Sequence, residues 1–166
     1  MKKTTNNTKK NTNYVNTAEI GNKLHKHLAE RARLQQKQDQ IWAYIKRTQC
    51  NRTSEMEKID AQIGANTHEI DKLIGQLIRA GWHSGKAHSM AIGYLKSEIA
   101  RNQRIASYRE NHIKKVARGE SYWVSSTGKT HTDNASQIAY VAKKKKKIAL
   151  HQKMLSQLLA MQWRAA

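Results

Sequence analysis

The chain has 166 residues, and its 31 Lys and Arg against 12 Asp and Glu give a formal charge of +19. The length suits one domain of ordinary size or one elongated bundle with tails, and the single cysteine excludes an intrachain disulfide and any multi-cysteine zinc site. Because this charge far exceeds what solubility requires, it favours a polyanionic partner, with nucleic acid ahead of an anionic membrane surface or an acidic protein.

Residues 1–16 consist mostly of Lys, Thr and Asn and contain almost no apolar side chain. Such a segment buries too little surface to offset its ordering entropy, so we expect a disordered basic arm, which either follows phosphates or has no function. The arm lacks the apolar core of a signal peptide, and no part of the chain is apolar for long enough to span a bilayer. We therefore expect a cytoplasmic (intracellular) protein with no membrane partner.

The absence of proline allows long uninterrupted helices throughout residues 17–166, which we expect to form a single helical domain. The first predicted helix spans about 17–48. Three polar residues, His27, Arg31 and Gln38, interrupt its apolar stripe, and such a residue snorkels, fixes the register or contacts another chain. The apolar residues of its inner face are Ile20, Leu24, Leu28, Leu34, Ile41, Trp42 and Ile45.

The second predicted helix spans 54–80. Ser54 and Glu57 predict a capping box at its start, and Gly81 predicts a C-cap. Asn66 falls in the seam, where an Asn in a coiled coil selects register or oligomer state at a cost in stability. Apolar residues recur at steps of three, four and seven, at Met56, Ile59, Ile63, Ile70, Leu73 and Leu77.

The third predicted helix spans 89–118 and repeats this rhythm. A short link framed by Gly81 and Gly85 joins it to the preceding helix. We therefore expect 54–80 and 89–118 to pack against each other as an antiparallel coiled-coil hairpin. The apolar stripe of the third helix consists of Ile92, Leu95, Ile99, Ala106, Ile113 and Val116.

The opposite face of the third helix predicts a binding surface. It combines basic residues with tyrosine, contains no acidic residue and suits contacts with a phosphate backbone and with stacked bases. A solvated outer face of a bundle is the alternative, although such a face usually mixes both signs of charge. The residues of this predicted ridge are Tyr94, Arg101, Arg104, Tyr108, Asn111, Lys115 and Arg118.

The segment 120–133 changes character and predicts a small β-hairpin or a loop inserted between helices. Two short β-prone runs flank a turn-like sequence that ends at Lys129. Because an isolated hairpin is marginally stable, it must pack on the bundle, and Trp123 is the side chain best suited to that contact. Lys129 at the tip of the hairpin is a candidate phosphate contact.

The last predicted helix spans about 135–163 and contains five consecutive lysines, Lys143 to Lys147 (Lys143, Lys144, Lys145, Lys146 and Lys147). A run of five covers every side of a helix, and its mutual repulsion makes an external counter-charge favourable. Beyond Leu150 the helix is apolar on most sides, so we expect it in the centre of the bundle or in a subunit contact.

No constellation for catalysis, metal binding or nucleotide binding emerges from the sequence. Two glycine-containing segments, 81–87 and 127–130, resemble fragments of a phosphate-binding loop but lack its spacing and its strand–loop–helix context. The histidines lack a convergent third ligand, and carboxylates are too few and too scattered for a two-metal site. We expect no enzyme, no cofactor and no bound metal.

The sequence therefore predicts an all-α protein, an elongated antiparallel helical bundle with a small insertion. We expect it to bind nucleic acid, DNA or RNA, largely without sequence specificity, as a small subunit or accessory factor of a larger nucleoprotein complex. The seam and the C-terminal helix would mediate contact with other subunits or self-association. The alternative is a coiled-coil structural or regulatory interaction protein that binds an acidic protein partner.

Overall fold

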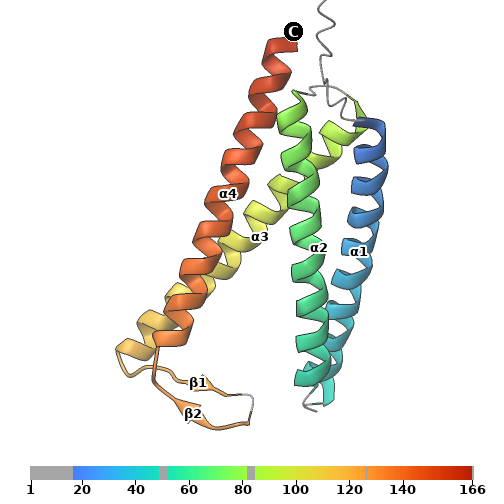
Figure 1. The fold of residues 1–166 in the computed structure, drawn as a ribbon. Helices are drawn as coiled ribbons and strands as arrows, with labels where there is room; N and C mark the ends of the chain where they lie inside the picture. The colour runs from blue at the N-terminus through green and yellow to red at the C-terminus, as the bar shows by residue number, and fades with distance from the viewer. Residues whose placement is uncertain (1–16, 49–51, 82–84, 126, 166) are drawn as a thin grey trace, which may run out of the picture.

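The computed structural model describes residues 17–48, 52–81, 85–125 and 127–165, so the predicted basic arm at 1–16 lies outside the described residues. Within these ranges the chain forms four long helices and a two-stranded antiparallel sheet (Figure 1). The predicted all-α class, the antiparallel bundle and the small insertion are confirmed. The elements in chain order are α1 (Thr17–Thr48), α2 (Thr53–Ala80), α3 (Lys86–Ala117), β1 (Trp123–Val124), β2 (Thr130–His131) and α4 (Ala135–Ala165).

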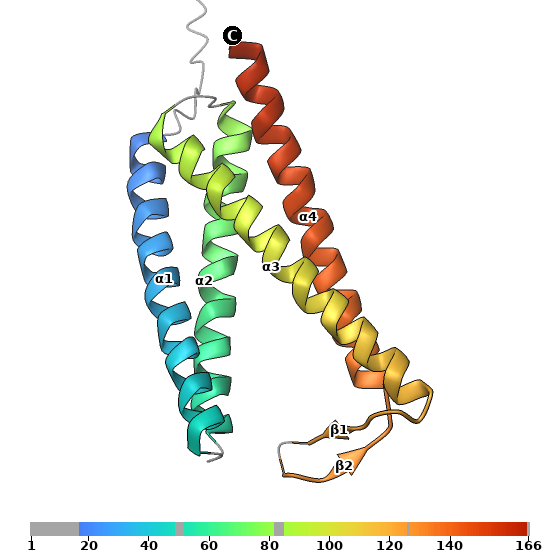
Figure 2. The ribbon, with the colours of Figure 1, turned by 180° about the vertical axis from the view of Figure 1, so that it is seen from behind.

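The helices pair in sequence order, α1 with α2 and α3 with α4, so the molecule consists of two antiparallel helical hairpins. The two hairpins lie close together at the end where α2 is followed by α3, here called the closed end. They diverge toward the end where α1 is followed by α2, here called the open end (Figures 1 and 2). The predicted pairing of 54–80 with 89–118 is therefore wrong. An apolar stripe shows which face of a helix is buried but not which helix covers it.

The main apolar core lies at the closed end, where all four helices contribute. α1 approaches α3 closely there, because a Cβ atom on Gly21 would lie only 3.2 Å from the Cβ atom of Ala87. The absence of a side chain at Gly21 thus allows the two hairpins to meet. The buried residues of this core are Ile20, Leu24, Ile70, Leu73, Ile74, Leu77, Ala87, Ala91, Tyr94, Leu95, Met154 and Leu158.

A second, smaller apolar cluster lies nearer the open end and involves α1 and α2 alone. Leu34 and Ile41 of α1 pack there with Met56 and Ile59 of α2. The predicted stripe of 54–80 is thus buried along its length, but different partners cover its two halves. Toward the open end the two hairpins are therefore packed separately, and the space between them is not filled by a shared core.

The ends of the helices differ in part from the predicted caps. Gly81 adopts the left-handed conformation with φ of 68°, which confirms the predicted C-cap of α2. The predicted capping box is wrong, because α2 begins at Thr53 and Arg52 precedes it without a side-chain cap. At the start of α4, the Asp133 carboxylate accepts a hydrogen bond of 2.9 Å from the amide of Ala135.

The insertion is the predicted β-hairpin, in which Trp123 pairs with His131 and Val124 with Thr130. Trp123 is 9% exposed, and its indole N–H donates a 2.8 Å hydrogen bond to Asn134 Oδ1. Its ring also lies 4.3 Å from the His112 ring, between centroids. The hairpin is thus packed on the open-end half of α3 and α4 through Trp123, as predicted.

The buried face of α4 is not uniformly apolar, and some of its apolar side chains are exposed. His151 is completely buried beside Met154 and Leu158, whereas Ile138 is 55% exposed. Leu150 also remains 44% exposed, so the helix is not buried on all sides within this chain. Self-association through the C-terminal helix stays a prediction.

Candidate nucleic-acid interface

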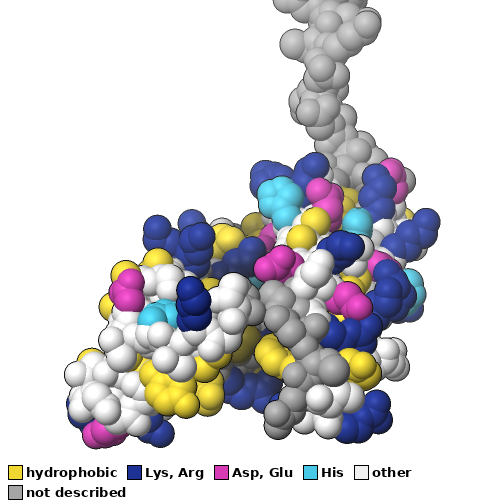
Figure 3. All heavy atoms as spheres, turned by 90° about the horizontal axis from the view of Figure 1, so that it is seen from below, with side chains coloured by type: hydrophobic (Ala, Val, Ile, Leu, Met, Phe, Trp, Pro, Cys, Tyr) yellow, Lys and Arg dark blue, Asp and Glu magenta, His cyan; other side chains and the backbone are white. Residues whose placement is uncertain are grey.

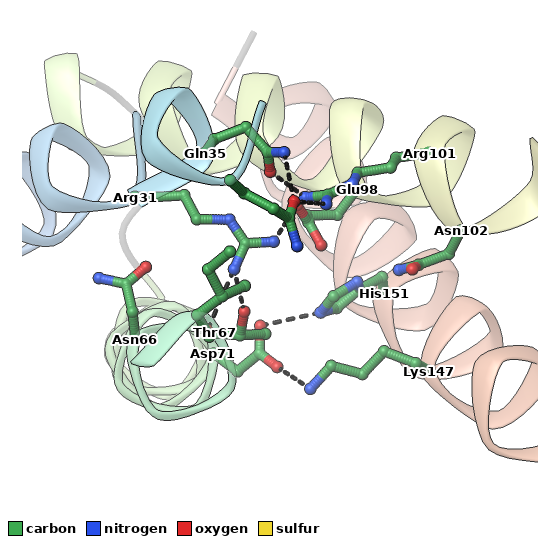
Figure 4. A network of polar contacts seen from close by, with 12 residues as sticks. Arg31, Gln35, Asn66, Thr67, Asp71, Glu98, Arg101, Asn102, Lys147 and His151 are labelled. Atoms are coloured by element: carbon green, nitrogen blue, oxygen red, sulfur yellow. Dashed lines mark hydrogen bonds and ion pairs between the residues drawn. The ribbon is translucent and has the colours of Figure 1, made fainter. Parts of the chain in front are cut away.

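A network of polar side chains joins the two hairpins (Figure 4). Arg31 of α1 is buried, and its guanidinium donates to the carbonyl oxygen of Ile63 at 3.1 Å and to the hydroxyl of Thr67. The same guanidinium forms an ion pair of 2.6 Å with Glu98 of α3. Arg31, a polar residue in the apolar stripe of α1, therefore fixes the arrangement of three helices.

Asp71 forms the second half of this network by joining α2 to α4. Its carboxylate accepts bonds from Lys147 Nζ at 2.6 Å and from His151 Nε2 at 2.8 Å (Figure 4). Burial by itself raises the pKa of the Asp71 carboxyl, but the hydrogen bonds and charges of His151 and Lys147 outweigh it, so the pKa lies below its ordinary value. The ionised carboxylate is therefore the form that the folded protein stabilises.

Asn66 acts within the chain at the α1–α2 seam. Its side-chain amide donates a 2.9 Å hydrogen bond to the backbone carbonyl of His27, and its Oδ1 atom is buried without a partner. The bond joins α1 to α2, and the selection of register or oligomer state by Asn66 stays a prediction. Asn66 itself is buried in this seam within the chain.

A cleft of about 920 Å³ opens between the two hairpins, with Arg31, Thr67 and Glu98 of the polar network at its floor. All four helices line it. Seen from the open end, Lys and Arg side chains and hydrophobic side chains gather around the hollow between the two halves (Figure 3). The basic side chains that line the cleft are Arg31, Arg101, Arg104, Arg109, Lys143, Lys144 and Lys147.

Only two acidic residues, Asp60 and Glu98, line the cleft among the described residues. Each is already engaged, because Asp60 accepts a 2.6 Å bond from Gln38 and Glu98 pairs with Arg31. Four of the seven basic side chains form no ion pair with any carboxylate in the described part of the chain. These four are Arg104, Arg109, Lys143 and Lys144.

Three aromatic side chains also line the cleft, one on each of α1, α3 and α4. Trp42 is 50% exposed and Tyr108 is 71% exposed. Tyr140 is half-buried, with the Arg109 guanidinium 4.8 Å and the Lys144 ammonium 5.4 Å from its ring centroid. The expectation that Trp42 belongs to the inner face of the first helix is wrong, because the diverging hairpins leave it beside the cleft.

The structure brings six of the predicted site residues together in this cleft. Of these, Arg104, Tyr108 and Lys143 are exposed, whereas Arg101 is partly buried and donates hydrogen bonds to Gln35 and, at 3.1 Å, to Gln38. Arg101 therefore connects α3 to α1 rather than standing on an exposed ridge. The six residues are Arg101, Arg104, Tyr108, Lys143, Lys144 and Lys147.

Tyr94 does not belong to an exposed ridge, and its assignment as a nucleic-acid contact is wrong. It is 7% exposed, and its ring makes an edge contact with the His151 ring at 6.0 Å between centroids. Burial, together with the nearby carboxylates of Glu98 and Asp71, raises the pKa of the Tyr94 phenol far above its ordinary value. α3 crosses the other helices at an angle. The side of its first half that carries Tyr94 is therefore buried, although the periodicity assigned that side to the surface.

The remaining predicted contacts lie on the surface outside the cleft. Lys115, Arg118 and Lys129 are exposed, and Arg118 forms a 3.2 Å ion pair with Glu120. Lys145 and Lys146 are exposed as well, and Lys145 pairs with Glu110 of α3. The lysine run thus has two roles. Lys145 and Lys147 form ion pairs within the chain, and other lysines of the run line the cleft.

Among the basic and aromatic residues of the cleft, the sequence-based prediction missed four: Arg31, Arg109, Trp42 and Tyr140. Arg31 interrupts an apolar stripe, which was a usable signal for a structural role but not for a site. Arg109 directly follows Tyr108, so helix periodicity assigns it to another side of α3. The packing of α3 against α4, which no pattern in the sequence indicates, brings it beside Tyr140.

The described residues contain no group of three or more His, Cys, Asp or Glu side chains that could hold a metal ion. In these same segments, no helix combines the length and the apolar character required to cross a membrane. Comparison with known proteins found no matching family, no matching curated protein and no matching solved structure.

Proposed function

We propose that this protein binds nucleic acid through the basic cleft, with little sequence preference, as a small subunit or accessory factor of a nucleoprotein complex. The observation that carries the proposal is the charge of the cleft, where seven basic side chains face two acidic ones that are already engaged. Phosphate groups supply the counter-charges that the chain itself does not provide.

The distribution of charge along the chain supports the same proposal. Residues 17–80 carry eleven basic and eight acidic side chains, whereas residues 81–166 carry sixteen basic and four acidic ones. The α3/α4 half is therefore the strongly cationic wall of the cleft. The α1/α2 half adds Arg31 to the floor and Trp42 to the opposite wall.

Salt dependence tests this proposal with random-sequence DNA and RNA, each as a duplex and as a single strand. Four basic groups without ion pairs predict that the logarithm of the binding constant falls with the logarithm of the salt concentration with a slope of about −3 to −4. The double variant Arg104→Gln/Lys143→Gln should weaken binding and reduce that slope by about 1.5, since two phosphate contacts are lost.

The matched control is Lys96→Gln/Lys153→Gln, which removes the same charge from exposed positions of α3 and α4 outside the cleft. This control should retain the full slope. The proposal fails if no nucleic acid binds at low salt, or if both double variants weaken binding equally. Stronger binding to polyglutamate than to nucleic acid at equal charge would instead favour an acidic protein as the partner.

A further inference from the structure

The aromatic side chains of the cleft are not accounted for by a simple affinity for phosphate. Trp42 and Tyr108 project from different hairpins into the same cleft, and both rings retain at least half of their exposure. Large aromatic side chains normally gain their stabilisation by burial, and phosphate groups alone would not require them. Two exposed rings on opposite walls therefore indicate a ligand with flat apolar faces.

Basic groups accompany these rings along the α3/α4 wall. Tyr108 lies four residues after Arg104 on α3, so both side chains occupy the same side of that helix. Tyr140 has Arg109 at 4.8 Å and Lys144 at 5.4 Å from its ring centroid. The wall thus alternates rings with cations, which is the arrangement that binds bases and phosphates of one strand together.

We infer that the cleft binds single-stranded nucleic acid, with unpaired bases stacked on Trp42 and Tyr108 and phosphates beside Arg104 and Lys143. This inference rests on the proposed nucleic-acid function and narrows its ligand. In a duplex the bases stack on each other and expose only their edges, whereas an unpaired base offers a free face to an aromatic ring.

The size of the cleft agrees with this choice of ligand. Its volume of about 920 Å³ falls in the range of pockets for small molecules, which is enough room for a few unpaired bases. The apolar side chains Met56, Ile63 and Ile105 also line it and offer a base an environment away from water. DNA and RNA strands share the bases and phosphates invoked here, and only RNA adds a 2′-hydroxyl.

The test compares the affinities of short single strands of DNA and RNA with that of a duplex of equal length, at one salt concentration. The variants are Trp42→Leu and Tyr108→Leu, which remove the ring but keep an apolar side chain. Tyr122→Leu is the control, because Tyr122 is 57% exposed and lies outside the cleft. A strand without bases that carries the same phosphates measures the contribution of charge to the affinity without that of stacking.

Each cleft variant should weaken single-strand binding by at least about fivefold, because stacking on one ring is lost. Its affinity for the duplex and for the strand without bases should stay unchanged, and the control should bind every ligand as the native protein does. Circular dichroism of the exposed-ring variants checks that the helices remain folded.

The outcomes separate this inference from the proposed function. If the native protein binds duplex and single strand equally, and the cleft variants lose affinity for neither, the inference is overturned while binding through phosphates stands. If no nucleic acid binds at low salt, both are overturned. A preference for DNA or for RNA among the single strands supports the inference and identifies which of the two nucleic acids the cleft binds.

Discussion

The closed end and the open end of the molecule are built from the same four helices but are held together differently. At the closed end, all four contribute to one apolar core, and the Arg31 and Asp71 networks bind the two hairpins to each other. At the open end, α1 and α2 share a separate apolar cluster, while the β-hairpin packs on α3 and α4. Stability therefore resides mainly in the closed end, and the open end leaves space for a ligand.

This difference shows how one chain combines a rigid support with an accessible site. A bundle closed along its whole length would bury Trp42 and Tyr108 and would bring the cleft-lining cations together in a low-dielectric core, where unpaired charges are costly. Divergence of the hairpins avoids that cost by keeping the cations near water. The network residues then fix how far apart the two walls of the cleft lie.

The largest expected effect concerns Arg31. Replacing it in Arg31→Met leaves Glu98 buried without its closest cation, so the free energy of unfolding should fall by about 4 kcal/mol. Chemical denaturation measures this change. Since the network also sets the relative position of the two hairpins, affinity for nucleic acid should fall as well.

Two further variants decide whether the Arg31 effect comes from a stranded charge. Arg31→Met/Glu98→Leu should recover most of the lost stability, because both charges are removed together. Arg33→Met, which removes only an exposed pair with Glu30, should leave stability unchanged. If Arg31→Met behaves like Arg33→Met, the closed end does not depend on this network.

A smaller effect, with a defined pH dependence, is expected at Asp71. Since the pKa of its carboxyl is lowered by folding, its stabilising contribution is complete above the ordinary Asp pKa of about 4 and is lost as the pH falls through the lower folded value. At neutral pH, Asp71→Asn should lower the free energy of unfolding by about 2 kcal/mol.

The difference between the native protein and Asp71→Asn should shrink as the pH falls below about 4, as followed by urea denaturation at several pH values. Glu69→Gln, an exposed neighbour on α2, is the control and should show no such trend. A difference that stays constant down to pH 2 would contradict the role given to the ionised Asp71 carboxylate.

The smallest effect is expected at Tyr94, whose hydroxyl is buried without a hydrogen-bond partner. Tyr94→Phe should leave stability unchanged or raise it by up to about 1 kcal/mol, because an unsatisfied polar group is removed. Affinity for nucleic acid should not change. A large loss of affinity in Tyr94→Phe would contradict its placement in the closed-end core.

The sequence allowed much of the fold to be predicted because helix formation depends on local signals. Four helices and their approximate ends could be predicted from the absence of proline, from apolar residues at steps of three and four, and from Gly81 as a C-cap. Trp123 identified the side chain that packs the β-hairpin on the helices. Six of the predicted contact residues do line the cleft, because an excess of basic residues on α3 and α4 is a property of the sequence itself.

Which helices pair, and where they separate, was decided only by the tertiary structure. The stripe of α2 is apolar both where it packs on α1 and where it joins the closed-end core, so periodicity could not choose its partners. The same limitation placed Tyr94 outside and Trp42 inside, whereas the diverging hairpins bury the first and expose the second. A sequence determines the composition of each helix face, but the angle between helices depends on contacts distant in the chain, such as Arg31 with Glu98 and Gly21 with Ala87.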